Sequence, residues 1–337
     1  MLNNYAKFLV MSLLTVSTVA VNAQTVRGTI TLPGYPEQVA VDPFSNRVYV
    51  AIPNFGLFGD GSYDYLTVVD GKKDVVLTNV QIPPSATAVA VDYIRHRVYV
   101  GGQDSLTLAS EVSVIDSRTN KLLDTISVTS TTSGTGVLGL AVNLETGTLY
   151  AANSSDNEID VIRHGGVTAR IALTGEPVAV SVNPFKNTIY ASRTDGFVDI
   201  ISGQTKTVTT SAPFGAVNQG IAVDLGTGNV LVVGNPSTPG AASVGILNPT
   251  GTVLSTIAIG NGAVGIDVDP FTHLAFAANT TDDTLSVIND KTGAVTLTMP
   301  VSSLFVAANH QSGKVYVSPI DPVTSLTVID EGQHHEE

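Results

Sequence analysis

One phrase recurs seven times along this chain and constrains its fold more than any other feature. Each copy has an apolar run, an Asp or Asn, a short polar turn and a second apolar run that usually carries an aromatic residue. A fixed period in this range indicates an array of supersecondary units. The Asp or Asn markers lie 40 to 51 residues apart, at Asp42, Asp92, Asn143, Asn183, Asp224, Asp269 and Asn309.

The third repeat shows how one unit divides into strands. Apolar side chains alternate over 138–142, 148–152, 159–162 and 168–173, and polar turns separate these segments. A period of two is the spacing of side chains on a β-strand. No segment of the repeats has a sustained period of 3.6 residues, so we expect four antiparallel strands in each unit and no substantial helix.

Four-stranded units arranged around an axis protect their edge strands and form a β-propeller. We therefore predict an all-β fold, a seven-bladed β-propeller of four-stranded antiparallel blades. The seventh unit lacks its outer strand, because the chain ends soon after the strand expected at 325–329. Residues 25–34 resemble 251–260, the outer strand of the fifth unit. We expect this N-terminal strand to close the last blade.

The first 23 residues differ from the repeats in composition. Lys7 precedes an uncharged and mostly apolar stretch over 8–21, and residues 21–23 (Val-Asn-Ala) have the small side chains of a cleavage site. This pattern predicts a signal peptide over 1–23 and one propeller domain over 24–337, secreted or periplasmic. A membrane anchor is the alternative, although the apolar stretch is shorter than the roughly 20 residues of a spanning helix.

Composition narrows the range of partners. Among 337 residues the formal net charge is -13, which matches poorly with the phosphate backbone of nucleic acid. Hydrophobic residues make up 43% and charged residues 13%, as expected for a filled interior rather than disorder. The absence of cysteine permits an oxidising compartment. We expect a monomer with no nucleic-acid partner and, after removal of the signal peptide, no membrane span.

Two repeats carry a family resemblance. Residues 150–162 read Tyr-Ala-Ala-Asn, five residues, Ile-Asp-Val-Ile, and residues 276–289 follow the same pattern with Phe first. They resemble the YVTN repeat of seven-bladed propellers, and the resemblance covers nearly all of 24–337. It implies the propeller fold without implying one activity, because similar repeats occur in archaeal surface-layer proteins, lactonase-like propellers and many secreted bacterial proteins.

A propeller topology sorts the charged residues between two rims. If the strands of a blade are a to d from the axis outward, the d-to-a and b-to-c connections share one rim. This rim, which we call the acidic rim, has one base, Arg193, and 11 acids. Turn preferences alone could produce the asymmetry; alternatively, the rim attracts cations. The acids are Glu37, Asp60, Asp64, Asp104, Asp156, Glu158, Glu176, Asp195, Asp282, Asp283 and Asp321.

The long b-to-c connection of the first repeat is rich in apolar side chains. Such a cluster either folds back beside the channel or docks a partner, here an unidentified protein or a cationic ligand. Asp60, Ser62 and Asp64 alternate as in Ca²⁺ loops, although Gly71 replaces the bidentate Glu of an EF-hand. This makes Ca²⁺ the one candidate cofactor. The candidate partner-binding residues are Phe55, Leu57, Phe58, Tyr63, Tyr65, Asp156, Glu158, Asp195, Asp282 and Asp283.

The motifs for catalysis are weak. The six histidines fall in turns of the opposite rim or in the C-terminal tail, where we expect solvated side chains. No Cys nucleophile or Gly-x-Ser-x-Gly elbow occurs. Residues 134–139 and 260–265 match a dinucleotide fingerprint but run into strands instead of helices. Polar groups at the channel mouth could still support hydrolysis of a small ester or lactone, with Glu37, Glu176, Arg193 and Asn218 as candidates.

The leading prediction is a non-catalytic binding or scaffold propeller that contacts its partner through the acidic rim. A lactonase-like hydrolase is the alternative, and a structural element of a surface layer is a third. The fold does not decide between them, because propellers host many unrelated functions.

Overall fold

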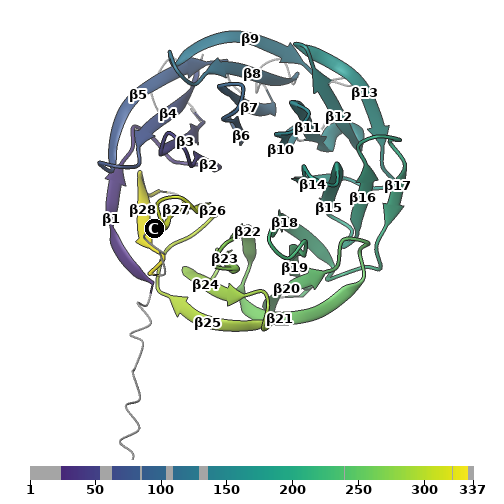
Figure 1. The fold of residues 1–337 in the computed structure, drawn as a ribbon. Helices are drawn as coiled ribbons and strands as arrows, with labels where there is room; N and C mark the ends of the chain where they lie inside the picture. The colour runs from purple at the N-terminus through teal and green to yellow at the C-terminus, as the bar shows by residue number, and fades with distance from the viewer. Residues whose placement is uncertain are drawn as a thin grey trace, which may run out of the picture.

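Seven four-stranded sheets surround a central axis in the computed structural model (Figure 1). All the strand pairs are antiparallel, and this confirms the predicted all-β, seven-bladed propeller. The expected signal peptide, 1–23, lies outside the described part of the chain. The structure describes residues 24–53, 63–83, 86–103, 109–128, 136–238, 240–320 and 322–332.

The first four blades follow one another along the chain, each from its inner to its outer strand. Blade 1 contains β2 (Val39–Asp42), β3 (Arg47–Ile52), β4 (Asp64–Asp70) and β5 (Val75–Ile82). Blade 2 contains β6 (Ala88–Asp92), β7 (Arg97–Gln103), β8 (Ser110–Asp116) and β9 (Lys121–Ser127). Blade 3 contains β10 (Val137–Asn143), β11 (Thr148–Asn153), β12 (Glu158–Arg163) and β13 (Gly166–Ala172). Blade 4 contains β14 (Pro177–Asn183), β15 (Thr188–Arg193), β16 (Val198–Ser202) and β17 (Val208–Thr210).

The last three blades complete the ring. Blade 5 contains β18 (Val217–Val223), β19 (Val230–Asn235), β20 (Ala241–Leu247) and β21 (Val253–Asn261). Blade 6 contains β22 (Ala263–Asp269), β23 (Leu274–Asn279), β24 (Thr284–Asn289) and β25 (Ala294–Met299). Blade 7 contains β26 (Phe305–Asn309), β27 (Lys314–Ser318), β28 (Ser325–Asp330) and, as its outer strand, β1 (Thr25–Thr31).

The two ends of the described chain meet in blade 7. β1 pairs with β28 in an antiparallel register that places Ile30 opposite Leu326. Both side chains are buried in one cluster with Leu32 and Tyr316, so the pairing is also a hydrophobic contact. This confirms that the N-terminal strand closes the last blade.

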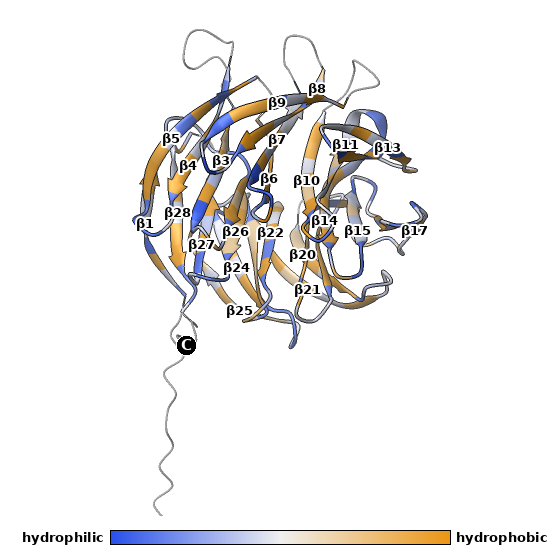
Figure 2. Cartoon of the chain, turned by 45° about the horizontal axis from the view of Figure 1, so that its top comes forward, coloured by the Kyte–Doolittle hydropathy of each residue, from blue (hydrophilic) through white to orange (hydrophobic). Residues whose placement is uncertain are grey.

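Helix is confined to one short turn among the described residues, the 3-10 element η1 (Ser154–Asp156). None of these residues belongs to a helix long and apolar enough to cross a bilayer. Figure 2 shows hydrophobic stretches along the strands around the ring. The core therefore consists of sheet faces packed against each other.

The aromatic residue of the repeat packs between blades. Tyr316 of blade 7 contributes to one cluster with Val39 and Val48 of blade 1, and Tyr190 of blade 4 packs with Ile221 of blade 5. Such a ring buries a large apolar area against the neighbouring sheet. Blade 5, which has Leu231 at this position, packs it against blade 6 in the same way. The aromatics that are completely buried here are Tyr49, Tyr150, Tyr190, Phe276 and Tyr316.

The markers of the repeat shape the turn between the first two strands of each blade. In blade 1, Asp42 Oδ1 accepts hydrogen bonds from the backbone N–H groups of Phe44 (3.0 Å) and Ser45 (3.1 Å). The fifth residue of the turn, counted from the marker, adopts a left-handed conformation that favours Gly and Asn. We call this residue the fifth turn residue: Asn46, His96, Gly147, Asn187, Gly228, His273 and Gly313.

Candidate functional site at the channel and the acidic rim

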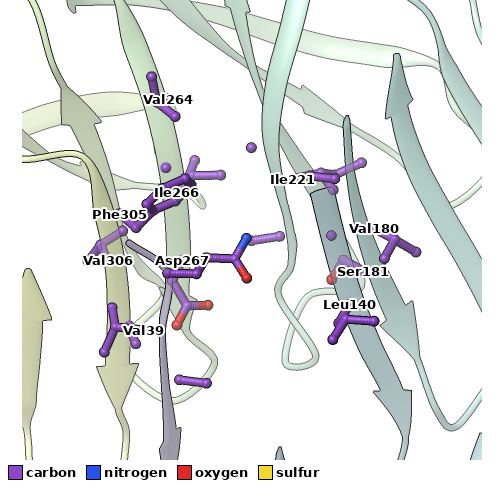
Figure 3. Close-up of a pocket in the computed structure, with 18 of the residues that line it drawn as sticks. Val39, Leu140, Val180, Ser181, Ile221, Val264, Ile266, Asp267, Phe305 and Val306 are labelled. Atoms are coloured by element: carbon purple, nitrogen blue, oxygen red, sulfur yellow. The ribbon is translucent and has the colours of Figure 1, made fainter. Parts of the chain in front are cut away.

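The innermost strands surround a central cavity of about 520 Å³ (Figure 3). Val39, Leu140 and Ile221 belong to its mostly apolar wall. Two residues before the marker, six blades have a small residue, and the five alanines among them pack in hydrophobic clusters. These residues are Ala40, Ala90, Ala141, Ser181, Ala222 and Ala307.

Blade 6 has Asp267 at this position, so a carboxylate joins the channel wall (Figure 3). Its Oδ2 accepts a hydrogen bond from the Ala308 backbone N–H (2.9 Å), and its Oδ1 accepts one from that of Val268 (2.9 Å). Burial raises the pKa of Asp267 to about 6, although these hydrogen bonds oppose the shift. Asp267 is not among the residues predicted from the sequence, although alignment of the seven repeats shows it as the one acid at its position.

The four candidate catalytic residues divide between two places. Glu37 lines the channel, whereas Glu176, Arg193 and Asn218 do not belong to the lining of this cavity. Glu176 Oε1 accepts a hydrogen bond from Ser154 Oγ (2.6 Å). Asn218 is buried, and its Nδ2 donates to the Phe197 carbonyl (3.1 Å). The hydrolase interpretation stays a prediction. Glu176 and Asn218 make hydrogen bonds within the fold and lie outside the lining of the channel.

Arg193 is the centre of a buried charge network in blade 4. Its side chain is 4% exposed, and Nη1 lies 3.2 Å from Asp199 Oδ2 and 2.6 Å from Thr174 Oγ1. Its Nε donates to Asp195 Oδ1 (2.9 Å), and Nη2 bonds the other oxygen of this carboxylate. These bonds lower the pKa of Asp195. The negative charge of Asp195 is thus neutralised by Arg193 within the fold.

The acids of blade 3 are also engaged. Arg170, on the outer strand β13, places Nη1 2.6 Å from Glu158 Oε1 and 3.2 Å from Asp160 Oδ1. Asp156 accepts a hydrogen bond from Asn153 Nδ2 (2.9 Å). Because Arg170 reaches the rim from a strand, its sequence position did not indicate this role. Blade 3 therefore contributes less net negative charge to the acidic rim than the sequence suggested.

The candidate calcium loop is described only in part. Phe55, Leu57, Phe58, Asp60 and Ser62 lie outside the described residues, as do Asp104 and Asp321 of the acidic rim. Tyr63 is 45% exposed, whereas Tyr65 is partly buried and packs against the hydrophobic cluster between blades 7 and 1. Asp64 is buried, and its Oδ2 accepts a hydrogen bond from the Ala86 backbone N–H (2.8 Å). Calcium binding and partner docking at this loop stay predictions.

Blade 6 presents two neighbouring exposed acids of the rim, Asp282 and Asp283. Asp282 is exposed and accepts hydrogen bonds from the backbone N–H (2.8 Å) and the Nδ2 (2.9 Å) of Asn261. Asp283 is exposed in a left-handed conformation, and it has no side-chain partner within the described ranges. Neither carboxylate pairs with a Lys or Arg of the described chain. A surface hollow of about 610 Å³ beside them is lined by Asp283, Pro300, Ser302, Ile320, Pro322 and Val323.

Comparison with known proteins assigns no family: no protein-family model matches the chain, and no curated protein matches it. The functional inference therefore depends on the geometry of the channel and the acidic rim. Within that geometry, Asp282 and Asp283 combine exposed negative charge with an adjacent apolar surface.

Proposed function

We propose that this protein is a secreted or periplasmic, non-catalytic binding propeller of the YVTN-repeat kind, and that it contacts a protein partner through the acidic rim. The observation that carries the proposal is the pair Asp282 and Asp283, which are exposed beside a largely apolar hollow and have no basic partner among the described residues. The two carboxylates would attract a Lys or Arg of the partner. The hollow would receive an apolar side chain next to it.

In blades 3 and 4, arginine side chains already neutralise acids of the acidic rim, and this favours blade 6 as the contact. Arg170 and Arg193 pair with the rim acids of blades 3 and 4 and also with the buried Asp160 and Asp199, so a partner there would have to displace internal ion pairs. Displacing a buried pair leaves a buried charge uncompensated, which is costly. Exposed charges without partners impose no such cost, and they accelerate association with a basic surface.

The test is binding of the native partner to Asp283→Asn. Partners are recovered by cross-linking in the extracytoplasmic compartment, identified, and titrated against purified wild-type and variant protein at two salt concentrations. We expect weaker binding by the variant at low salt, and a smaller loss of affinity on adding salt, because one screened attraction has been removed.

The matched control is Asp124→Asn, which removes one exposed charge from the outer strand β9, away from the rim. It should bind the partner as the wild type does. Equal affinities for wild type, Asp283→Asn and Asp124→Asn would contradict the proposed contact.

A further inference from the structure

Three titratable side chains meet between blades 5 and 6, on the rim opposite the acidic rim. Asp224 is the marker of blade 5, His273 is the fifth turn residue of blade 6, and Asp290 directly follows β24. His273 Nδ1 lies 2.6 Å from Asp224 Oδ2 and 4.0 Å from Asp290 Oδ1. One nitrogen and two carboxylate oxygens therefore converge, all within 4.8 Å of one another.

Other blade interfaces make the corresponding link without charge. Asn143 Nδ2 donates to Asn187 Oδ1 (2.8 Å) between blades 3 and 4, and Asn309 Nδ2 donates to Asn46 Oδ1 (2.9 Å) between blades 7 and 1. A pair of amides is thus sufficient to join two turns of this propeller. The link between blades 5 and 6 instead uses an acid and a histidine.

The third member of the cluster, Asp290, lies at a position where blade 7 also has an acid, Glu331, whereas three other blades have none. In three other blades the equivalent residue is Gly71, Ser117 or Gly203, and its backbone N–H donates to the carbonyl of the fifth turn residue. Asp290 makes the same backbone bond to His273 (3.0 Å) and adds a carboxylate. The local fold does not require this carboxylate.

The two acids are buried next to each other and to His273. Both side chains are 0% exposed, and neither has a Lys or Arg partner in the part of the chain that the structure describes. Asp290 Oδ1 has no hydrogen-bond partner there either. Two carboxylates in contact disfavour each other's ionised form, and burial increases the penalty. A cation between them would remove it.

The remaining oxygens of both acids are already held. Asp224 Oδ1 accepts a hydrogen bond from the Gly226 backbone N–H (2.7 Å), and Asp290 Oδ2 accepts one from Thr227 Oγ1 (3.0 Å). Metal ligands are commonly oriented by such second contacts, which leave one atom of each side chain for the ion. Here Asp290 Oδ1 faces Asp224 Oδ2 and His273 Nδ1, which are in hydrogen-bond contact with each other (2.6 Å), so an ion would take the place of the hydrogen between them.

We propose that Asp224 Oδ2, His273 Nδ1 and Asp290 Oδ1 bind one divalent transition-metal ion such as Zn²⁺. A mixed set of imidazole and carboxylate ligands suits Zn²⁺ and its neighbours, whereas Ca²⁺ and Mg²⁺ prefer oxygen alone. The ion neutralises both acids and joins blade 5 to blade 6. The side chain of His273 is 13% exposed, so its edge reaches solvent and gives the ion a path of entry.

The first experiment measures metal bound per chain. The protein is purified without a histidine tag, with His334→Ala and His335→Ala as background, because the adjacent pair His334 and His335 is an alternative ligand. After treatment with a chelator it is equilibrated with Zn²⁺, gel-filtered and analysed for metal. We expect one Zn²⁺ per chain, a higher melting temperature with Zn²⁺, and Co²⁺ absorption bands typical of nitrogen and oxygen ligation.

Two substitutions copy residues that the chain itself uses at equivalent positions. His273→Asn imitates Asn187, and Asp290→Ser imitates Ser117, so both variants should keep the fold. We expect each to lose more affinity for Zn²⁺ than the roughly 10–100-fold that removal of an outer contact costs. The matched control is His96→Asn, which changes the equivalent histidine of blade 2, where Ser117 replaces the second acid. It should retain one Zn²⁺.

The experiments distinguish a metal ion bound by the two acids from a proton that the two acids share. If the two acids only share a proton, the background protein binds no Zn²⁺, its melting temperature does not respond to the metal, and Co²⁺ gives no such bands. That result overturns the proposal, and it requires no variant of the cluster. Zn²⁺ binding that survives both His273→Asn and Asp290→Ser, or that His96→Asn abolishes, would overturn it as well.

Discussion

Arg193 illustrates how a residue's role depends on what surrounds it. By sequence it is the one base of an acidic rim and one of four candidate residues for hydrolysis of a small ester or lactone. In the fold, its guanidinium is enclosed by Asp195, Asp199 and Thr174. Two of these partners lie within six residues of it, but neither strand alternation nor turn composition indicates that the side chains fold together.

Replacing Arg193 with Ala should destabilise the protein strongly. Asp199, whose side chain is 1% exposed, would be left as a buried charge without compensation. Breaking a buried pair in this way costs about 3–5 kcal/mol. Urea unfolding measures the change, with Arg163→Ala on an exposed arginine as the control, for which we expect less than about 1 kcal/mol. Similar losses for the two variants would contradict the structural role of Arg193.

At the level of elements, the closing strand β1 could be predicted from the sequence, and only one face of it is buried. The match of 25–34 to 251–260 indicated an outer strand, because both have the same alternation and lead into an inner strand. Along β1, Ile30 is 3% exposed in the core between blades 7 and 1, whereas Val26 is 50% exposed. One strand thus offers a buried and an exposed position for comparison.

Truncating Ile30 to Ala should weaken ring closure. Removal of a buried Ile side chain costs about 2–5 kcal/mol through lost burial and the cavity that remains. Val26→Ala on the same strand should change the free energy of unfolding by less than about 0.5 kcal/mol. Urea unfolding of both variants gives the comparison. If Val26→Ala destabilised the protein as much as Ile30→Ala, closure would not depend on the buried face of β1.

At the scale of the whole molecule, a buried acid, Glu331, lies where the two ends of the described chain meet. Glu331 follows β28, its backbone N–H donates to the Gly313 carbonyl (2.7 Å), and its own carbonyl accepts a hydrogen bond from Gln24 Nε2 (2.9 Å). Burial, followed by the charge of Asp269, raises the pKa of the Glu331 carboxyl to about 8. The folded ring therefore holds a proton that the unfolded chain releases near pH 4.5.

This shift makes stability depend on pH. A carboxyl group whose pKa is raised by folding contributes its full stability below its unfolded pKa and loses it as the pH rises through the folded value, at most about 1.4 kcal/mol per pH unit. The melting temperature should therefore fall between about pH 5 and pH 8. Glu331→Gln keeps the shape without the charge and should reduce this fall. An identical pH profile for the variant would exclude Glu331 as its source.

The sequence alone determined the architecture of this protein. Blade number, strand order and the closure of the ring follow from two patterns of the sequence: the alternation of apolar and polar residues within strands, and the repetition of the whole unit. The third repeat, for example, has strands within one or two residues of the ranges that its pattern predicts. The small residue two places before each marker likewise made Asp267 identifiable as an exception.

Only the tertiary structure decided which charged side chains meet. Asp224 and His273 are 49 residues apart, and Asp290 comes from a further turn of blade 6. Their contact depends on how two blades pack and on the left-handed turn that directs the imidazole toward its neighbour. A hydrogen bond or a metal ligand requires placement to within a few tenths of an ångström. A repeat pattern encodes which strands form, but not that placement, because the packing of several blades sets it together.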